Sequence, residues 1–341
     1  MALPPRGRAA GAGRAGILAG MPGPLAQVAL AAAVACAPDA YDRALLALAA
    51  RIESRPANRA LAARVEAARV AFEREPDAAR RALRAELDAA GLAIVRVPGL
   101  FYETYPQTGA SLAAVDAWLG GGTAFVETGE RAPVEEGAAR VARALRTALP
   151  PDRRAVLVSA SKGSADVRAA LEGEPALGAR AAAWIDLVGV LEGTPLADRA
   201  RPTRAAVREL LSEAAADSLA REVRSARADA SRFPAATRAY HVAAFPRAAE
   251  VGQRARAAFA ALCPLGPNDG YVLLDAYERA PGAVLVLRGA DHYLRVEGLL
   301  ARLGALLRVA LEDVGADARA AGEARAPPTR RCAARRGPGA S

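Results

Sequence analysis

The chain has 341 residues, 52% of them hydrophobic, and a formal net charge of +9; this length allows one large core, so we expect one α/β domain with appendages. The positive charge comes mainly from arginines in residues 1–38 and 325–341, which contain no acid and leave the part between them nearly neutral. The composition therefore gives no charge-based argument for a nucleic-acid partner, and no apolar run reaches the roughly 20 residues that a membrane span needs.

The first 38 residues are either a leader or a disordered tail. Three arginines precede an apolar run at 25–35, which ends in small residues immediately before Cys36. That pattern is typical of a signal peptide, or of a lipoprotein signal in which Ala33 replaces the usual aliphatic residue. The chain is accordingly cytoplasmic or, if this segment is a signal, exported or lipid-anchored.

The cysteines provide no obvious framework. Cys36, Cys263 and Cys332 are an odd number, lie far apart in the sequence and have no paired spacing. The pattern supports neither a disulfide framework nor a thiolate metal site. We expect no metal and no cofactor, and the sequence leaves the oligomeric state open.

Residues 39–90 are predicted to form a helical extension. Apolar residues recur there at helical spacing between charged ones, and the Glu75-Pro76 pair interrupts the run. No residue in this segment has a pattern that suggests chemistry. The segment is expected to pack against the main domain.

A strand at 92–97 opens the main domain, and three aromatic residues follow it. Pro98 and Gly99 end the strand, and the next loop contains Phe101, Tyr102 and Tyr105. Parallel sheets bind ligands at the carboxyl ends of their strands, so these rings are expected to line a substrate pocket. The alternative is that they only cover the edge of the sheet.

The rest of the main domain alternates strands with helices. Gly120-Gly121-Gly122 is interpreted as a turn before the next strand, because it lies before a strand rather than between a strand and a helix. Further elements are expected as strands at 123–127, 155–158, 181–189, 240–245 and 283–289, a helical cap at about 191–238, and a last helix at 296–314. The main domain thus spans 91–314, and residues 315–341 are expected to be a disordered basic tail.

The stretch from 154 to 168 is typical of a nucleophile elbow. Four apolar residues run into a cluster of small residues around Ser161, and an alanine-rich amphipathic segment follows. A nucleophile in such a strand-turn-helix junction needs small residues two positions before and after it. Only Ser161 meets that condition, with Ser159 and Gly163 on either side.

Two further polar residues follow predicted strands at the same edge of the sheet. Asp269 lies in the loop 266–270, and His292 follows the last strand. A serine hydroxyl needs a neighbouring imidazole to accept its proton, and a carboxylate fixes the imidazole tautomer. Asp186, at the end of its own strand, is a second candidate for the acid. His241 lies inside a strand and is interpreted as structural.

These motifs resemble those of the α/β-hydrolase superfamily, which includes esterases, lipases and thioesterases. The resemblance covers residues 88–312 and rests on Ser159-Ala160-Ser161-Lys162-Gly163, on the loop 266–270, on 289–292, and on the chain order Ser, Asp, His. It departs from the commonest elbow pattern in having Ser159 for the first glycine. It implies an α/β-hydrolase fold, with a mostly parallel central sheet flanked by helices.

The resemblance also implies roles for individual residues. Ser161 would be the nucleophile, His292 the general base and Asp269 its orienting acid. The oxyanion hole would use the backbone amides of Lys162 and of Leu100 or Phe101.

The expected function is hydrolysis of a carboxylic ester or thioester through an acyl-enzyme, with a small-molecule ester or acyl compound as substrate. The alternative is a non-catalytic binding or scaffold protein on the same fold. Ser159 and Lys162 also match the S-x-x-K motif, which contains the serine and lysine pair of penicillin-recognising enzymes. That motif requires a second lysine elsewhere, and the chain has none.

Overall fold

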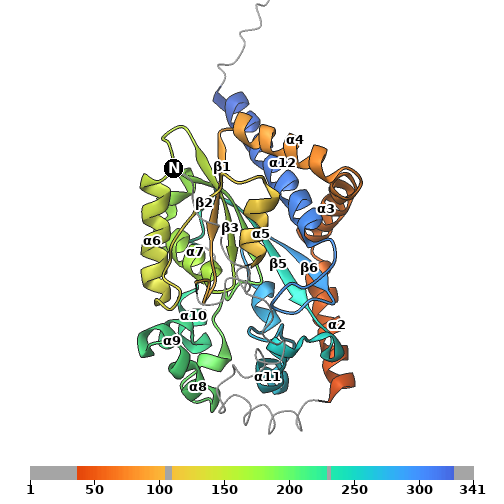
Figure 1. The fold of residues 1–341 in the computed structure, drawn as a ribbon, viewed down its shortest axis with the longest axis vertical. Helices are drawn as coiled ribbons and strands as arrows, with labels where there is room; N and C mark the ends of the chain where they lie inside the picture. Colours follow the sequence, from red (N-terminus) through yellow and green to blue (C-terminus); the bar gives the residue numbers. More distant parts are fainter. Residues whose placement is uncertain (1–36, 104–109, 229–231, 326–341) are drawn as a thin grey trace, which may run out of the picture.

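The computed structural model describes residues 37–103, 110–228 and 232–325 (Figure 1). Within them, six parallel strands form one sheet in the order β2-β1-β3-β4-β5-β6. The strands are β1 (Leu92–Val97), β2 (Ala124–Phe125), β3 (Arg154–Ala160), β4 (Ala181–Leu187), β5 (Arg238–Phe245) and β6 (Ala283–Arg288).

Helices cover both faces of this sheet. Figure 1 shows α6 and α7 on one side and α3, α4 and α12 on the other. The helices are α2 (Pro38–Glu53), α3 (Pro56–Arg74), α4 (Pro76–Ala89), α5 (Ala110–Trp118), α6 (Val134–Thr147), α7 (Lys162–Gly173), α8 (Thr203–Leu210), α9 (Glu213–Leu219), α10 (Arg221–Arg227), α11 (Gln253–Leu262) and α12 (Leu299–Arg325).

Each face of the sheet has its own core. Leu157 of β3 packs into one core with α6 and α7, whereas Val156 and Val158 pack into the other with α12. A strand buried on both faces needs apolar residues at consecutive positions, which explains the unbroken apolar run before Ser161. The sequence of β3 thus identifies it as a central strand.

The strand order changes direction beside β1. The chain passes from β1 to β2 on one side of it and then returns to β3 on the other side. The loops after β1 and β3 therefore diverge, and the space between them at the carboxyl edge is where open α/β sheets bind ligands.

The predicted helical extension, parallel sheet and cap are present, with some different boundaries. The cap consists of three short helices, α8, α9 and α10, because Leu211 and Ala220 adopt extended backbone between them. Helix α12 continues to Arg325, so the prediction of a disordered tail from 315 is wrong for its first part. The sequence 315–325 contains no proline, and Asp317 forms an ion pair with Arg238 of β5 at 2.5 Å.

A second difference concerns Cys263, which is buried and disulfide-bonded. The spacing of the cysteines did not predict a disulfide, because spacing along the chain carries no information on distance in the fold. In the part of the chain that the structure describes, no helix is both long and apolar enough to cross a membrane.

Candidate active site

Ser161 occupies the turn between β3 and α7, in a backbone conformation that few residues adopt. Its φ is 52°, in the left-handed region. A Cβ on Gly163 would lie 2.4 Å from the carbonyl oxygen of Pro98, so only glycine lets α7 approach the end of β1 this closely. Ser159, two residues before Ser161, is fully buried and accepts a hydrogen bond from Trp184 Nε1 at 2.7 Å. The positions two residues before and after Ser161 are therefore both tightly packed against neighbouring atoms.

His292 connects Ser161 to Asp269. Its Nε2 lies 2.9 Å from Ser161 Oγ, and its Nδ1 lies 2.8 Å from Asp269 Oδ2. Asp269 is fully buried, and the His292 side chain is 9% exposed. The structure therefore brings the three predicted residues, from the turn after β3, the loop after α11 and the loop after β6, into one line of hydrogen bonds.

The carboxylate of Asp269 is held by its own loop. Its Oδ1 accepts hydrogen bonds from the backbone N–H groups of Tyr271 and Val272, both at 2.9 Å. The backbone N–H of His292 donates to the carbonyl oxygen of Asp269 at 2.9 Å. These bonds fix the carboxylate and leave Oδ2 directed at the imidazole.

Helix α2 supports the same loop from outside. The Tyr41 hydroxyl donates to the Asn268 carbonyl at 2.8 Å and accepts from the Asn268 N–H at 3.1 Å. Burial raises the pKa of Tyr41 well above its usual value, so the hydroxyl stays protonated and remains a donor. No sequence pattern indicates this contact, because Tyr41 lies far from Asn268 along the chain.

Asp186 belongs to a different pair. Its Oδ2 lies 2.9 Å from His241 Nδ1, and both side chains are fully buried. The other ring nitrogen of His241 lies 2.6 Å from the Pro281 carbonyl oxygen. The structure therefore separates the two candidate acids: Asp269 contacts His292, and Asp186 contacts the histidine that was interpreted as structural.

The candidate oxyanion amides differ in availability. The Lys162 N–H is the first of helix α7, a position that has no carbonyl acceptor within its own helix. A Cβ on Gly99 would lie 2.9 Å from Ser161 Cβ, so the loop that carries Leu100 passes directly beside Ser161. The Phe101 N–H already donates to the Glu130 carbonyl at 3.3 Å, which favours Leu100 over Phe101.

The aromatic residues predicted to line the pocket lie in different surroundings. Phe101 packs, with Leu100, against an apolar cluster of the cap that includes Leu211 and Leu219. Tyr102 instead packs edge-on against Phe125 of β2, with 5.5 Å between ring centroids. Tyr105 lies outside the described residues.

Sequence reasoning missed two groups around the site. Tyr271 packs against the His292 ring, with 4.9 Å between centroids, and its hydroxyl lies 3.0 Å from that of Tyr293. Lys162, the single lysine, buries its side chain against Asp166, with Nζ–O distances of 2.9 and 2.7 Å. The i, i+4 spacing on α7 was the available signal for this ion pair.

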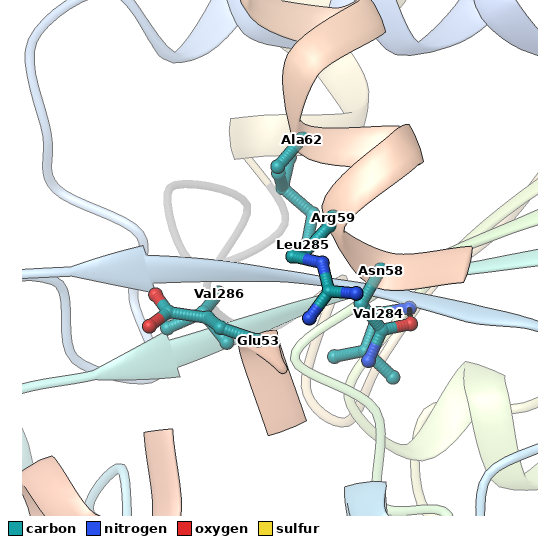
Figure 2. A pocket seen from close by; sticks show the side chains of 7 residues that line it. All are labelled: Glu53, Asn58, Arg59, Ala62, Val284, Leu285 and Val286. Carbon is teal, nitrogen blue, oxygen red and sulfur yellow. Dashed lines mark hydrogen bonds between the residues drawn. The ribbon is translucent and has the colours of Figure 1, made fainter. Parts of the chain in front are cut away.

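A hollow of about 370 Å³ lies elsewhere, between α2, α3 and strand β6 (Figure 2). It is lined by Glu53, Asn58, Arg59, Ala62, Val284, Leu285 and Val286, and it shares no residue with the site around Ser161. Among the described residues, no group of three or more His, Cys, Asp or Glu side chains could hold a metal ion.

A parallel sheet with a serine in a left-handed strand-to-helix turn, followed along the chain by an acid and a histidine, defines the α/β-hydrolase architecture. Comparison with solved structures agrees. A metagenomic carboxyl esterase matches with a TM-score of 0.53 and 29% identity, over 66% of this chain and 76% of the esterase. The mature form of a Bacillus licheniformis lipase matches with a TM-score of 0.50 and 22% identity, over 65% of this chain and 92% of the lipase.

The chain therefore has the α/β-hydrolase fold, which confirms the fold predicted from the sequence. No protein-family model matches the sequence. A search of curated proteins also finds no match.

Proposed function

We propose that the chain is a serine hydrolase that cleaves a carboxylic ester or thioester through an acyl-enzyme. The observation that carries the proposal is the unbroken line of hydrogen bonds from Ser161 through His292 to Asp269. The likeness to a carboxyl esterase supports the reaction class.

In the first step, Ser161 Oγ attacks the acyl carbonyl carbon while His292 Nε2 accepts the hydroxyl proton. Asp269 holds the imidazole with its Nδ1–H toward the carboxylate and stabilises the imidazolium that forms. The carbonyl oxygen gains negative charge, and the backbone N–H groups of Lys162 and Leu100 are the proposed donors to it.

Collapse of the tetrahedral intermediate breaks the bond to the alcohol or thiol, which takes the proton from His292 as it leaves. A water molecule then gives a proton to the same nitrogen and attacks the acyl carbon. The second collapse releases the carboxylic acid and restores the Ser161 hydroxyl.

The cap supports an apolar acyl group as the substrate class. Leu100 and Phe101 leave β1 beside Ser161 and pack into the apolar cluster of the cap. A hydrocarbon chain bound there would replace water at an apolar surface, which favours binding.

Labelling with a fluorophosphonate probe tests the proposal, because the probe reacts with an activated serine. We expect the wild type to be labelled and Ser161→Ala to be unlabelled and to lose hydrolysis of a short-chain nitrophenyl ester. Ser225→Ala is the matched control, since Ser225 is an exposed serine whose hydroxyl donates to the Arg221 carbonyl of its own helix. A folded wild type that is not labelled would contradict the proposal and favour a non-catalytic protein on this fold.

A further inference from the structure

Asp291 directly precedes His292 in the sequence and is 5% exposed. A carboxylate buried to this extent needs hydrogen-bond donors, and the donors that it finds indicate its role. We propose that Asp291 is a positioning residue: it attaches the loop after β6 to the amino end of α11 and thereby holds the imidazole of His292 in line with Ser161. This inference rests on the proposed function, since it concerns the general base of that reaction.

The two carboxylate oxygens of Asp291 accept hydrogen bonds from different segments of the chain. Oδ2 accepts the backbone N–H of Gly252 at 2.8 Å, and Oδ1 accepts the backbone N–H of Tyr293 at 3.0 Å. Gly252 is the N-cap of α11, whereas Tyr293 directly follows His292. The carboxylate therefore joins the loop that carries the general base to the start of a helix.

The backbone of the same loop is closed into a tight turn around His292. The carbonyl oxygen of Asp291 accepts the N–H of Leu294 at 2.9 Å, and Leu294 has a φ of 51°, in the left-handed region. A residue other than glycine in this region costs free energy and persists only where the surrounding contacts hold it. The side-chain and main-chain hydrogen bonds of Asp291 supply such contacts.

The amino end of α11 also contacts the loop that carries the acid. Gly270 directly follows Asp269, and a Cβ on Gly270 would lie 2.7 Å from the Cβ of Ala255 in the first turn of α11. The loops of the acid and of the base therefore pack on the same helical turn. The hydrogen bond from Asp291 fixes the second of these loops to that turn, and so fixes the base relative to the acid.

Gly252 lies so close to Asp291 that it offers a second way to break the contact. A Cβ on Gly252 would lie 2.9 Å from Asp291 Oδ2, nearer than a Cβ atom approaches its neighbours in real structures. The φ and ψ of Gly252 are −66° and 156°, which alanine adopts without strain. Gly252→Ala should therefore displace the carboxylate at no cost to the backbone conformation.

The kinetics of variants test the proposal. Asp291→Ala should lower kcat for a short-chain nitrophenyl ester and the rate of fluorophosphonate labelling by about 10–100-fold, with little change in KM, because a displaced base slows the chemistry and leaves substrate binding intact. Asp291→Asn should be intermediate, since its amide oxygen still accepts one of the two hydrogen bonds. Asp42→Ala is the matched control: the Asp42 carboxylate accepts the Ala248 N–H at 3.1 Å, in the segment just before α11, and its loss should lower the melting temperature but not kcat.

A double-mutant cycle tests the contact itself. Gly252→Ala should lower kcat in the wild-type background but have no further effect in Asp291→Ala, because the carboxylate that it displaces is then absent. Additive losses would overturn the proposal, and so would an Asp291→Ala variant that melts earlier but reacts and is labelled at the wild-type rate. If Asp291→Ala does not fold, Gly252→Ala alone decides, since a wild-type kcat in that variant contradicts the proposed role.

NMR of the imidazole rings gives a readout that does not depend on hydrolysis. The chain contains two histidines, so isotope-labelled histidine provides one reporter, His292, and one internal reference, His241 in its buried pair with Asp186. Asp291→Ala should shift the ring signals of His292 and leave those of His241 unchanged, and His292→Ala assigns the two sets. Unchanged His292 signals in a protein whose wild type is labelled would overturn this inference alone. A wild type that is not labelled would contradict the proposed function and, with it, this inference.

Discussion

At the scale of single residues, the sequence predicts Ser161 and His292 as nucleophile and general base because their patterns are local. The elbow needs small residues at fixed positions, and one of only two histidines follows the last strand. The acid could not be chosen in this way, since Asp186 lies near the end of a strand and Asp269 lies in a loop between two strands, and both positions suit a triad acid. The structure distinguishes them by their contacts with His241 and His292.

This difference predicts opposite behaviour of two matched variants. Asp269→Asn should lower kcat/KM by about 10³–10⁴-fold with little loss of fold, because the imidazole loses the partner that fixes its tautomer. Asp186→Asn should instead lower the unfolding temperature, because it disrupts a fully buried pair, and should retain most of the activity per labelled molecule. Nitrophenyl ester kinetics and thermal melting measure the two effects. Equal losses of activity would contradict the assignment of Asp269.

At the scale of elements, the approach of α7 to β1 depends on Gly163. Gly163→Ala places a Cβ 2.4 Å from the Pro98 carbonyl oxygen, so α7 must move and shift Ser161 relative to Leu100. We expect a loss of about 1–3 kcal/mol in unfolding free energy and slower fluorophosphonate labelling. Gly173→Ala, at the other end of α7 with nothing within 4 Å of the added atom, is the control. If both variants label at the wild-type rate, the close approach does not position the serine.

The Lys162–Asp166 pair predicts a pH dependence of stability. Burial raises the pKa of the Asp166 carboxyl from 3.8 to about 7, although the Lys162 ammonium acts in the opposite direction. The folded state therefore retains a proton that the unfolded chain has released, so this contribution to stability is full below pH 3.8 and is lost as the pH rises through about 7.

Asp166→Asn cannot titrate at this position, so it removes this pH-dependent contribution and is the reference for the wild type. Urea unfolding at pH 5 and pH 8 should show that the wild type loses more stability than the variant between the two values. If the stability of the wild type and of the variant changes equally between the two pH values, Asp166 is ionised throughout this range and acts as a permanent ion-pair partner.

Element boundaries were predictable only where a breaker marks them. Proline starts α2, α3 and α4, and the Glu75-Pro76 pair predicts the break between α3 and α4. Helix α12 also ends just before a breaker, since Pro327 and Pro328 follow Arg325 in the sequence, whereas no proline lies near 314, where the helix is predicted to end; the ion pair of Asp317 lies in the additional turns. The sequence does not predict the breaks inside the cap. Ala220 is a strong helix former by propensity, but the fold holds it in a non-helical conformation between α9 and α10.

At the scale of the whole molecule, the helical extension packs along the edge of the sheet and also reaches the active-site loop. Tyr41, near the start of α2, contacts Asn268 of the active-site loop. Asn58, which follows the end of α2 in the first turn of α3, contacts strand β6. Helical periodicity predicted that α2 and α3 pack on the domain, but it contains no information on which surface they cover. The order of the strands, which leaves β6 at an edge, decides this.

Asn58 provides the test of this arrangement. The side chain is 2% exposed; its Oδ1 accepts from the Val284 N–H at 2.8 Å, and its Nδ2 donates to the Ile52 carbonyl at 2.7 Å. Asn58→Ala leaves both backbone groups without these partners, so we expect a loss of about 1–3 kcal/mol in unfolding free energy and faster hydrogen exchange at Val284. Arg59→Ala is the matched control, because Arg59 lines the same hollow (Figure 2) but is exposed, and its loss should cost less than about 0.5 kcal/mol. Unchanged exchange at Val284 in Asn58→Ala would show that water replaces the amide at no cost and that Asn58 does not secure the extension to the sheet.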